Sequence, residues 1–148
     1  MLIGISPLIG PDLLATLSRM GHGDELVLAD AHFPAESIGR RVVRADGLRI
    51  ADLLDGILPL FALDSDAPDP IAMMAPVDGD RADPAVHERY RAIIEAHHPR
   101  AQPTQFLPRF AFYDRARQAF AVVATGDTAT YANLVVKKGV TPIYTRTP

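Results

Sequence analysis

Cysteine is absent from the 148 residues of this chain. Its absence excludes disulfide bonds, thiolate nucleophiles and cysteine-ligated zinc, although it does not indicate a cellular compartment. No apolar run approaches the ~20 residues of a membrane-spanning helix. The opening MLIGISPLIGPDLL has no basic leader and is interrupted by glycine and proline. We therefore expect a cytoplasmic protein.

Clusters of lysine and arginine are also missing, and the formal net charge is −3. Nucleic acids and anionic membranes bind basic surfaces, so neither is an expected partner. The chain also has no glycine-rich phosphate-binding loop. We therefore expect no nucleotide, metal or other cofactor.

The length of the chain fits one domain, and we predict a single domain over residues 1–148. A chain of this size buries roughly 68–70% of its unfolded surface, so it needs no metal or disulfide for stability. Hydrophobic residues make up 48% of the sequence. This value lies at the high end of ordinary usage and weakly indicates apolar contacts between subunits.

Short apolar runs predict strands, and amphipathic stretches predict helices. The predicted strands cover residues 25–29, 41–45, 71–75, 120–125 and 134–138. The predicted helices cover residues 11–20 and 48–60, a third that follows the cap Asp83 and ends at residues 97–99, and a short fourth over residues 108–117. Residues 102–105 are predicted as loop. The alternation of helices and strands indicates an α/β fold with helices on both faces of a central parallel or mixed sheet.

The stretch GHGDELVLADAHFPA, residues 21–35, concentrates polar candidates around one predicted strand. His22 precedes this strand and Asp30 follows it. A five-residue strand is only about 16 Å long, so a loop that folds back could bring both side chains into one pocket. Histidine exchanges a proton near neutral pH, and aspartate can fix its tautomer or hold a substrate hydroxyl. The alternatives are a loop histidine that caps the preceding helix and a turn aspartate that bonds its own backbone.

Three later polar residues suit a polyhydroxylated ligand. Arg109 offers fixed donors for hydroxyls or a ring oxygen, with a surface ion pair as the alternative. Tyr131 and Asn133 lie two residues apart before the last predicted strand, so on an extended backbone both point to the same face. Their alternative is hydrogen bonding to nearby backbone. The aromatic residues beside Arg109 are predicted to lie in the core: Phe110, Phe112 and Tyr113.

Several segments make the sequence recognisable as a whole: ISPLI, MGHGDELVLADAHFPA, RADGL (44–48), RFAFYDRA (109–116), FAVVATGD (120–127) and YANLVVKKGV (131–140). In this order they resemble the fucose mutarotase branch of the family that it shares with ribose pyranase. The resemblance covers nearly the whole chain. It implies a three-layer α/β/α fold, which agrees with the pattern of elements. It also implies a ring-like homo-oligomer, commonly of ten subunits, with sites near the subunit contacts.

The resemblance further implies a cofactor-independent isomerase. Such a sugar mutarotase interconverts the α and β anomers of L-fucose or a related free aldopyranose by general acid/base ring opening and closure. His22 matches the catalytic histidine of the family, and Tyr131 is a candidate second proton carrier. Asp30, Arg109, Tyr131 and Asn133 are expected to bind the sugar. The pyranase branch tends to carry histidine at the position of Arg109, so this arginine favours fucose.

Three alternatives stay open at this point. The first is a D-ribose pyranase-type conversion between pyranose and furanose. The second is a non-catalytic sugar-binding module on the same fold. The third is a small metal hydrolase that uses His22, Asp30 and His32, although ligands so loosely spaced carry little specificity. For His32 we favour a supporting role beside the site.

Overall fold

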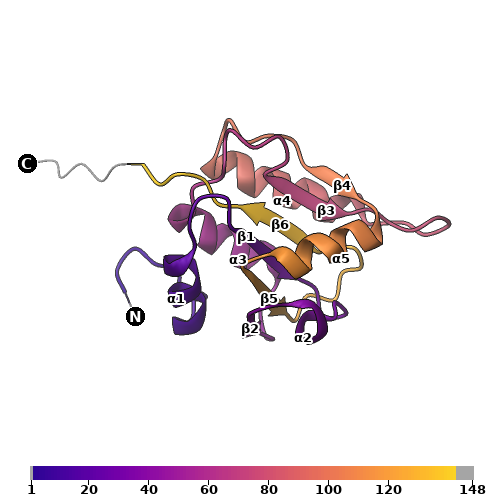
Figure 1. Ribbon diagram of the computed structural model, residues 1–148, viewed down its shortest axis with the longest axis horizontal. Helices are drawn as coiled ribbons and strands as arrows, with labels where there is room; N and C mark the ends of the chain where they lie inside the picture. Colours follow the sequence, from indigo (N-terminus) through magenta and orange to yellow (C-terminus); the bar gives the residue numbers. More distant parts are fainter. Residues whose placement is uncertain (1, 143–148) are drawn as a thin grey trace, which may run out of the picture.

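Six strands form one mixed sheet in the computed structural model, which describes residues 2–142 (Figure 1). The strands are β1 (Glu25–Ala29), β2 (Val42–Ala45), β3 (Ile71–Met74), β4 (Gln105–Leu107), β5 (Ala121–Thr125) and β6 (Leu134–Lys137). Their order across the sheet is β2-β5-β1-β6-β3-β4. The sheet is therefore the mixed form of the predicted α/β fold.

The direction of β6 decides which loops meet. This strand runs antiparallel to both of its neighbours, β1 and β3, whereas the other neighbouring pairs are parallel. The residues that precede β6 therefore lie at the same edge of the sheet as the residues that follow β1 and β3. We call this edge, where the five parallel strands end and β6 begins, the carboxyl edge. The opposite edge, where β1 begins and β6 ends, is the amino edge.

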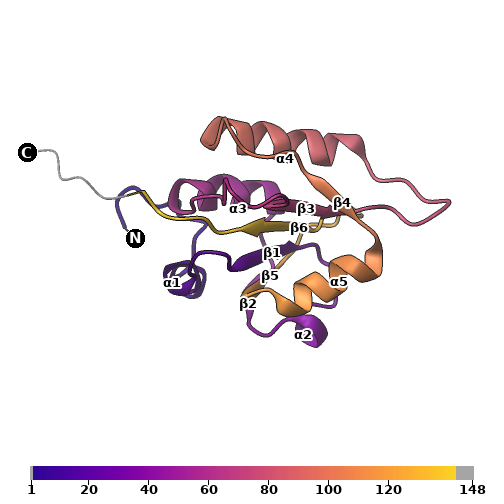
Figure 2. The ribbon, with the colours of Figure 1, turned by 45° about the horizontal axis from the view of Figure 1, so that its top comes forward.

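Five α-helices cover the two faces of the sheet: α1 (Pro11–Arg19), α2 (Ala35–Ile38), α3 (Ile50–Ile57), α4 (Pro84–His97) and α5 (Arg109–Gln118). Side chains of α1, α3 and α4 share one buried cluster with the sheet, and those of α2 and α5 share another. Figure 2 shows α3 and α4 on one side of the sheet and α2 and α5 on the other. This arrangement confirms the three layers. Within the described residues, none of these helices combines the length and apolar character that crossing a membrane requires.

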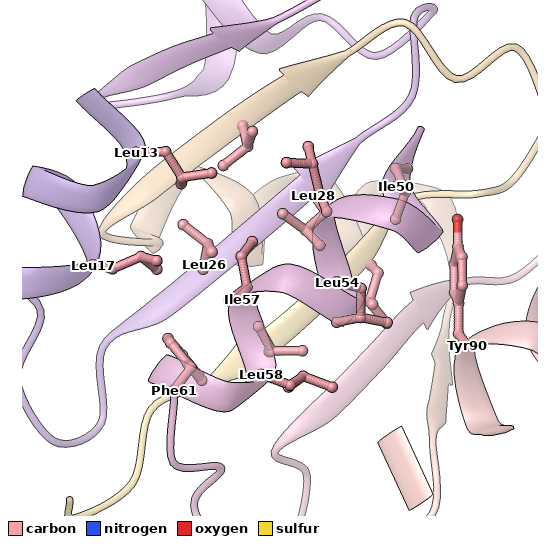
Figure 3. Close-up of a cluster of buried hydrophobic side chains, with 14 of the residues drawn as sticks. Leu13, Leu17, Leu26, Leu28, Ile50, Leu54, Ile57, Leu58, Phe61 and Tyr90 are labelled. Atoms are coloured by element: carbon pink, nitrogen blue, oxygen red, sulfur yellow. The ribbon is translucent and has the colours of Figure 1, made fainter. Parts of the chain in front are cut away.

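The central strand β1 explains why an uninterrupted apolar run is found after residue 25. Successive side chains of a strand point to opposite faces. Leu26 and Leu28 pack into the cluster with α1 and α3, part of which Figure 3 shows, whereas Val27 and Ala29 pack into the cluster with α5. These four side chains are fully buried, whereas Glu25 at the start of β1 is partly exposed. A strand covered on both faces needs apolar residues at every position.

Most of the predicted elements agree with the structure to within one or two residues. The predicted helix 48–60 is shorter than expected, because α3 ends at Ile57 and continues as a 3-10 turn, Leu58–Leu60. Pro59 within that turn has no N–H with which to extend the α-helix. The prediction missed α2, a single turn, and β4, a three-residue edge strand that is too short for an alternating pattern.

The aromatic residues of α5 divide between core and surface. Phe112 is fully buried, as predicted, whereas Phe110 is 74% exposed and Tyr113 is half-buried. The prediction of a core position is therefore wrong for Phe110. The helix presents only one side to the sheet, and Phe110 lies two residues from Phe112, so the two side chains point in different directions.

Asp83 caps α4 as the sequence predicts, since its Oδ1 accepts the backbone N–H of Ala85 at 2.9 Å. We expect Asp83→Ala to lower the free energy of unfolding by about 1 kcal/mol, because the first turn loses this acceptor. Urea denaturation at neutral pH measures the change. Asp83→Asn is the matched control, since its side-chain oxygen can accept the same hydrogen bond. An equal loss in both variants would contradict the capping role.

Candidate active site

Asp30 follows β1 at the carboxyl edge and is buried, with 5% of its surface exposed. Its Oδ1 accepts the backbone N–H of His32 at 2.9 Å, and its Oδ2 accepts the side-chain amide of Asn133 at 2.9 Å. Desolvation raises the pKa of Asp30 above its ordinary value, although backbone hydrogen bonds such as the one from His32 act in the opposite direction. The carboxylate is thus held in one orientation, which suits an acceptor for a ligand hydroxyl.

Asn133 is the partner that fixes Asp30 in place. Its Oδ1 accepts the backbone N–H of Asp30 at 2.8 Å, while its Nδ2 donates to the Asp30 carboxylate. The two residues are 103 positions apart in the chain and meet because β6 lies antiparallel beside β1. Asn133 therefore orients the carboxylate, and an amide with two N–H groups retains the capacity for a second donation.

Tyr131 has an unusual backbone conformation, with φ at +57°. Among the described residues it is the one non-glycine residue with positive φ. The condition under which Tyr131 and Asn133 would point to the same face, an extended backbone, is therefore not met at Tyr131. Residues other than glycine rarely adopt the left-handed backbone region unless the surrounding structure supports them. Such residues often occur at functional sites. Here the support comes from two hydrogen bonds: the Tyr131 hydroxyl donates to Asp80 Oδ2 at 2.7 Å, and the buried Tyr90 hydroxyl of α4 donates to the Ala132 carbonyl at 3.0 Å.

Arg109 begins α5 directly after β4, and this strand also ends at the carboxyl edge because it runs parallel to β3. Its Nε donates to the Tyr113 hydroxyl one turn further along the helix, at 3.2 Å. The guanidinium carbon lies 5.5 Å from the centre of the Tyr113 ring. Tyr113 thus holds the guanidinium in place. Arg109, Tyr113 and Tyr131 line the same cavity.

This cavity at the carboxyl edge has a volume of about 270 Å³. Ten residues line it: Asp30, His32, Phe33, Met74, Asp80, Arg109, Tyr113, Thr130, Tyr131 and Asn133. Drug-sized ligands occupy pockets of roughly 300–1,000 Å³, so this cavity suits a smaller molecule. Apolar and aromatic side chains can cover the C–H face of a ring, and the carboxylates, guanidinium and phenol can bind its hydroxyls. Four of the predicted site residues are therefore brought together.

His22, the fifth predicted site residue, lies elsewhere. It precedes β1 and so lies at the amino edge, where the neighbouring Gly23 N–H donates to the Lys138 carbonyl at 2.8 Å. The loop does not fold back over β1, and the expected single pocket with Asp30 is wrong for one chain. The His22 side chain is 55% exposed, so it is accessible rather than packed in the core.

Asp64 is the carboxylate that contacts His22. The His22 Nε2 lies 3.2 Å from Asp64 Oδ2, while Asp64 Oδ1 accepts the backbone N–H groups of Asp66 and Ala67 at 3.0 and 3.2 Å. The backbone hydrogen bond from Asp66 is the leading cause that holds the pKa of Asp64 below its ordinary value. An ionised carboxylate only accepts, so Nε2 carries a proton and Nδ1 is the basic nitrogen of the neutral ring. In one chain, Asp64 rather than Asp30 orients His22.

The metal hydrolase alternative needs His22, Asp30 and His32 around one ion. A single chain separates His22 from the other two by the length of β1. Over residues 2–142, the structure contains no group of three or more histidine, cysteine, aspartate or glutamate side chains placed to hold a metal ion. This metal triad is therefore wrong for a single chain.

Three residues with clear roles were not predicted: Asp64, Asp80 and Tyr113. Asp64 and Asp80 lie in long polar loops, where the sequence offers several equivalent aspartates. Tyr113 follows Arg109 by four residues on a helix, a spacing that places two side chains next to each other. That spacing is the one feature of the sequence that indicates a contact between Tyr113 and Arg109. The neighbouring apolar residues instead favour a core position for Tyr113.

Comparison with known proteins identifies relatives over nearly the whole chain. Residues 3–141 match the model of the RbsD / FucU transport protein family. The chain is 45% identical to a fucose mutarotase from Streptococcus pneumoniae whose crystal structure is in complex with L-fucose. That comparison covers 95% of this chain and 100% of the other, with a TM-score of 0.90.

Two further structures extend the comparison. FucU from Bifidobacterium longum is 46% identical, with 93% of this chain and 99% of the other covered and a TM-score of 0.88. RbsD from Bacillus subtilis, in a structure complexed with D-ribose, is 19% identical, with 95% and 99% covered and a TM-score of 0.71. At that identity, the likeness to RbsD shows a common fold and no more.

Proposed function

Because this chain belongs to the RbsD / FucU transport protein family, we propose that it is a mutarotase that interconverts the α and β anomers of L-fucose or a related aldopyranose. One observation carries the proposal: Asp30, Arg109, Tyr131 and Asn133 line one small polar cavity. The similarity to a fucose mutarotase that binds L-fucose supports the choice of sugar.

The reaction requires two proton transfers. One group takes the proton of the anomeric hydroxyl while another donates a proton to the ring oxygen, so the ring opens to the aldehyde. The C1–C2 bond then rotates and the ring closes on the other face. A positioned acid–base pair contributes ~10²–10⁴-fold to such a step. Each direction of the reaction reverses the roles of acid and base.

We assign the proton transfers to His22 and Tyr131, and sugar binding to Asp30, Arg109, Tyr131 and Asn133. The buried Asp30 carboxylate accepts a sugar hydroxyl without reorienting, because His32 and Asn133 already hold both of its oxygens. Arg109 supplies donors for a hydroxyl or the ring oxygen. The basic Nδ1 of His22 follows from the hydrogen bond between Nε2 and Asp64.

His22 reaches the cavity from a second copy of the chain in this proposal. One copy presents the cavity at its carboxyl edge and an exposed histidine at its amino edge. A head-to-tail contact between unlike edges places the two together, and repetition of that contact closes into a ring. A contact of this kind is compatible with the ring-like homo-oligomer that the resemblance implies, when its rotation closes. The number of subunits, commonly ten, comes from the resemblance alone. A cytoplasmic location is likewise part of the proposal.

Exchange NMR of the two anomers of L-fucose tests the proposed activity. We expect the wild-type protein at micromolar concentration to accelerate α/β exchange above the buffer rate, because the cavity combines an acid, a base and fixed sugar contacts. D-ribose serves as the comparison, with pyranose–furanose exchange as its readout. Faster conversion of ribose than of fucose would favour the pyranase alternative. Binding of fucose without accelerated exchange would favour the non-catalytic sugar-binding module and contradict the mutarotase.

A further inference from the structure

The connection between β3 and α4, residues 75–83, brings an aspartate to the cavity. This segment projects from the carboxyl edge, as Figures 1 and 2 show. Most of its residues are exposed, yet Asp80 reaches back to line the cavity with Arg109 and Tyr131. Asp80 is the residue of this connection that lines the cavity.

Asp80 determines the direction of the Tyr131 hydroxyl. Its Oδ2 accepts the phenol hydrogen at 2.7 Å, and its Oδ1 accepts the backbone N–H of Arg81 at 2.8 Å. Because an ionised carboxylate has no hydrogen to give, the phenol hydrogen must point at Asp80. The lone pairs of the phenol oxygen are then left for other donors, and the sugar cavity lies beside them.

We propose that Asp80 is a positioning residue for sugar conversion, because it holds the Tyr131 hydroxyl as a hydrogen-bond acceptor toward the cavity. This inference rests on the proposed mutarotase function and deepens it. Asp80 does not need to touch the sugar, since its effect passes through Tyr131. It assigns Tyr131 to the base side of the reaction and leaves His22 to serve the ring oxygen.

The proton balance of this assignment closes within the site. The O–H bond of the anomeric hydroxyl breaks as its proton moves to Tyr131 Oη, and the original phenol proton moves to Asp80 Oδ2. His22 enters the step protonated on both ring nitrogens, with Nε2 held by Asp64. The ring C–O bond breaks as the ring oxygen takes the proton from His22 Nδ1, which leaves the ring neutral. When the ring closes, all three protons return, so no outside reactant is consumed.

The charges around Tyr131 also favour transfer of the proton from the sugar to Tyr131 rather than from Tyr131 to the sugar. The hydrogen bond to Asp80 is the leading cause that raises the pKa of Tyr131, whereas the positive charge of Arg109 acts in the opposite direction. Asp30 and His32 are the other titratable groups lining the cavity with Tyr113. Loss of the phenol proton to the sugar would place a phenolate beside the Asp80 carboxylate, which is unfavourable. Tyr131 is therefore a poor acid while Asp80 is ionised.

Titration of Tyr131 tests the inference without reference to activity. Tyrosines labelled with ¹³C are followed by NMR against pH, and Tyr131→Phe identifies the signal of Tyr131. We expect Asp80→Asn to lower the pKa of this phenol toward the ordinary value of about 10. Asp78→Asn removes the same charge from the same exposed connection and is the matched control, with an unchanged titration. An Asp80→Asn variant that titrates like wild type would overturn the inference.

Kinetics then separate positioning from a structural effect. We expect Asp80→Asn to lower kcat by about tenfold or more, with KM changed less than kcat, because the amide cannot receive the phenol proton. The same substitution in a Tyr131→Phe background should have no further effect on kcat, since Asp80 acts through the missing hydroxyl. Additive losses would overturn the inference. If wild type does not accelerate exchange at all, the mutarotase proposal fails, and the titration still decides whether Asp80 controls Tyr131.

Discussion

His22→Ala is expected to slow the α/β exchange of L-fucose by about 10²–10⁴-fold, the usual contribution of a positioned proton-transfer group. The imidazole is exposed at the amino edge, and Asp64 leaves its Nδ1 as the basic nitrogen. The substitution removes the group that exchanges a proton with the ring oxygen and little else, because the side chain does not belong to the core. Exchange NMR at a fixed protein concentration measures the rate.

The control for this variant is His87→Ala. His87 lies on α4, where its ring packs edge-on against Phe106 and away from the cavity residues. We expect His87→Ala to exchange fucose at the wild-type rate. Circular dichroism and size-exclusion chromatography establish that both variants keep their fold and assembly. A folded His22→Ala protein with full activity would refute the assignment of His22.

Two inactive variants are expected to restore each other when they assemble together. His22→Ala lacks the proton carrier at the amino edge, and Arg109→Ala lacks the sugar contact at the carboxyl edge. In a head-to-tail ring, each site takes its histidine from one copy and its arginine from another. Random mixing of equal amounts then gives about one intact site in four, since each half is intact in half of the copies. Co-expression of differently tagged chains and exchange NMR on the purified mixture measure the recovery.

The same experiment separates a shared site from a site within one chain. Mixtures in which both variants are purified and assembled separately provide the baseline, because each of their rings lacks one half of every site. Recovery only after co-assembly supports a site built from two copies. Activity that stays at the baseline after co-assembly, with mixed rings present, would show that His22 and Arg109 act within one chain.

The features that depend on local sequence could be predicted. The apolar run of β1 and the Asp83 cap of α4 each reflect neighbouring residues, and both appear in the structure where they were expected. The elements that were missed, β4 and α2, are three and four residues long. Such short segments carry too few residues for a period to be recognised.

The site depends on contacts between distant parts of the chain, which a pattern of residues does not reveal. The sequence predicts Asp30 and Asn133 separately as site residues, but their mutual hydrogen bonds follow from the antiparallel position of β6 beside β1. Asp64 and Asp80 lie in loops rich in aspartate, so nothing in the sequence distinguished them from Asp66 or Asp78. The length of β1 agrees with the prediction from the sequence. His22 is nevertheless separated from Asp30, because the loop before β1 does not fold back over the strand as the prediction requires.

The left-handed backbone at Tyr131 has a consequence for any attempt to make this protein more heat-resistant. Glycine or asparagine adopts a positive φ at a lower energetic cost than tyrosine does. A laboratory selection that rewards thermal survival alone is therefore free to discard the phenol, and with it the turnover of sugar. Screens on this scaffold should hold position 131 constant, or score catalysis in every round.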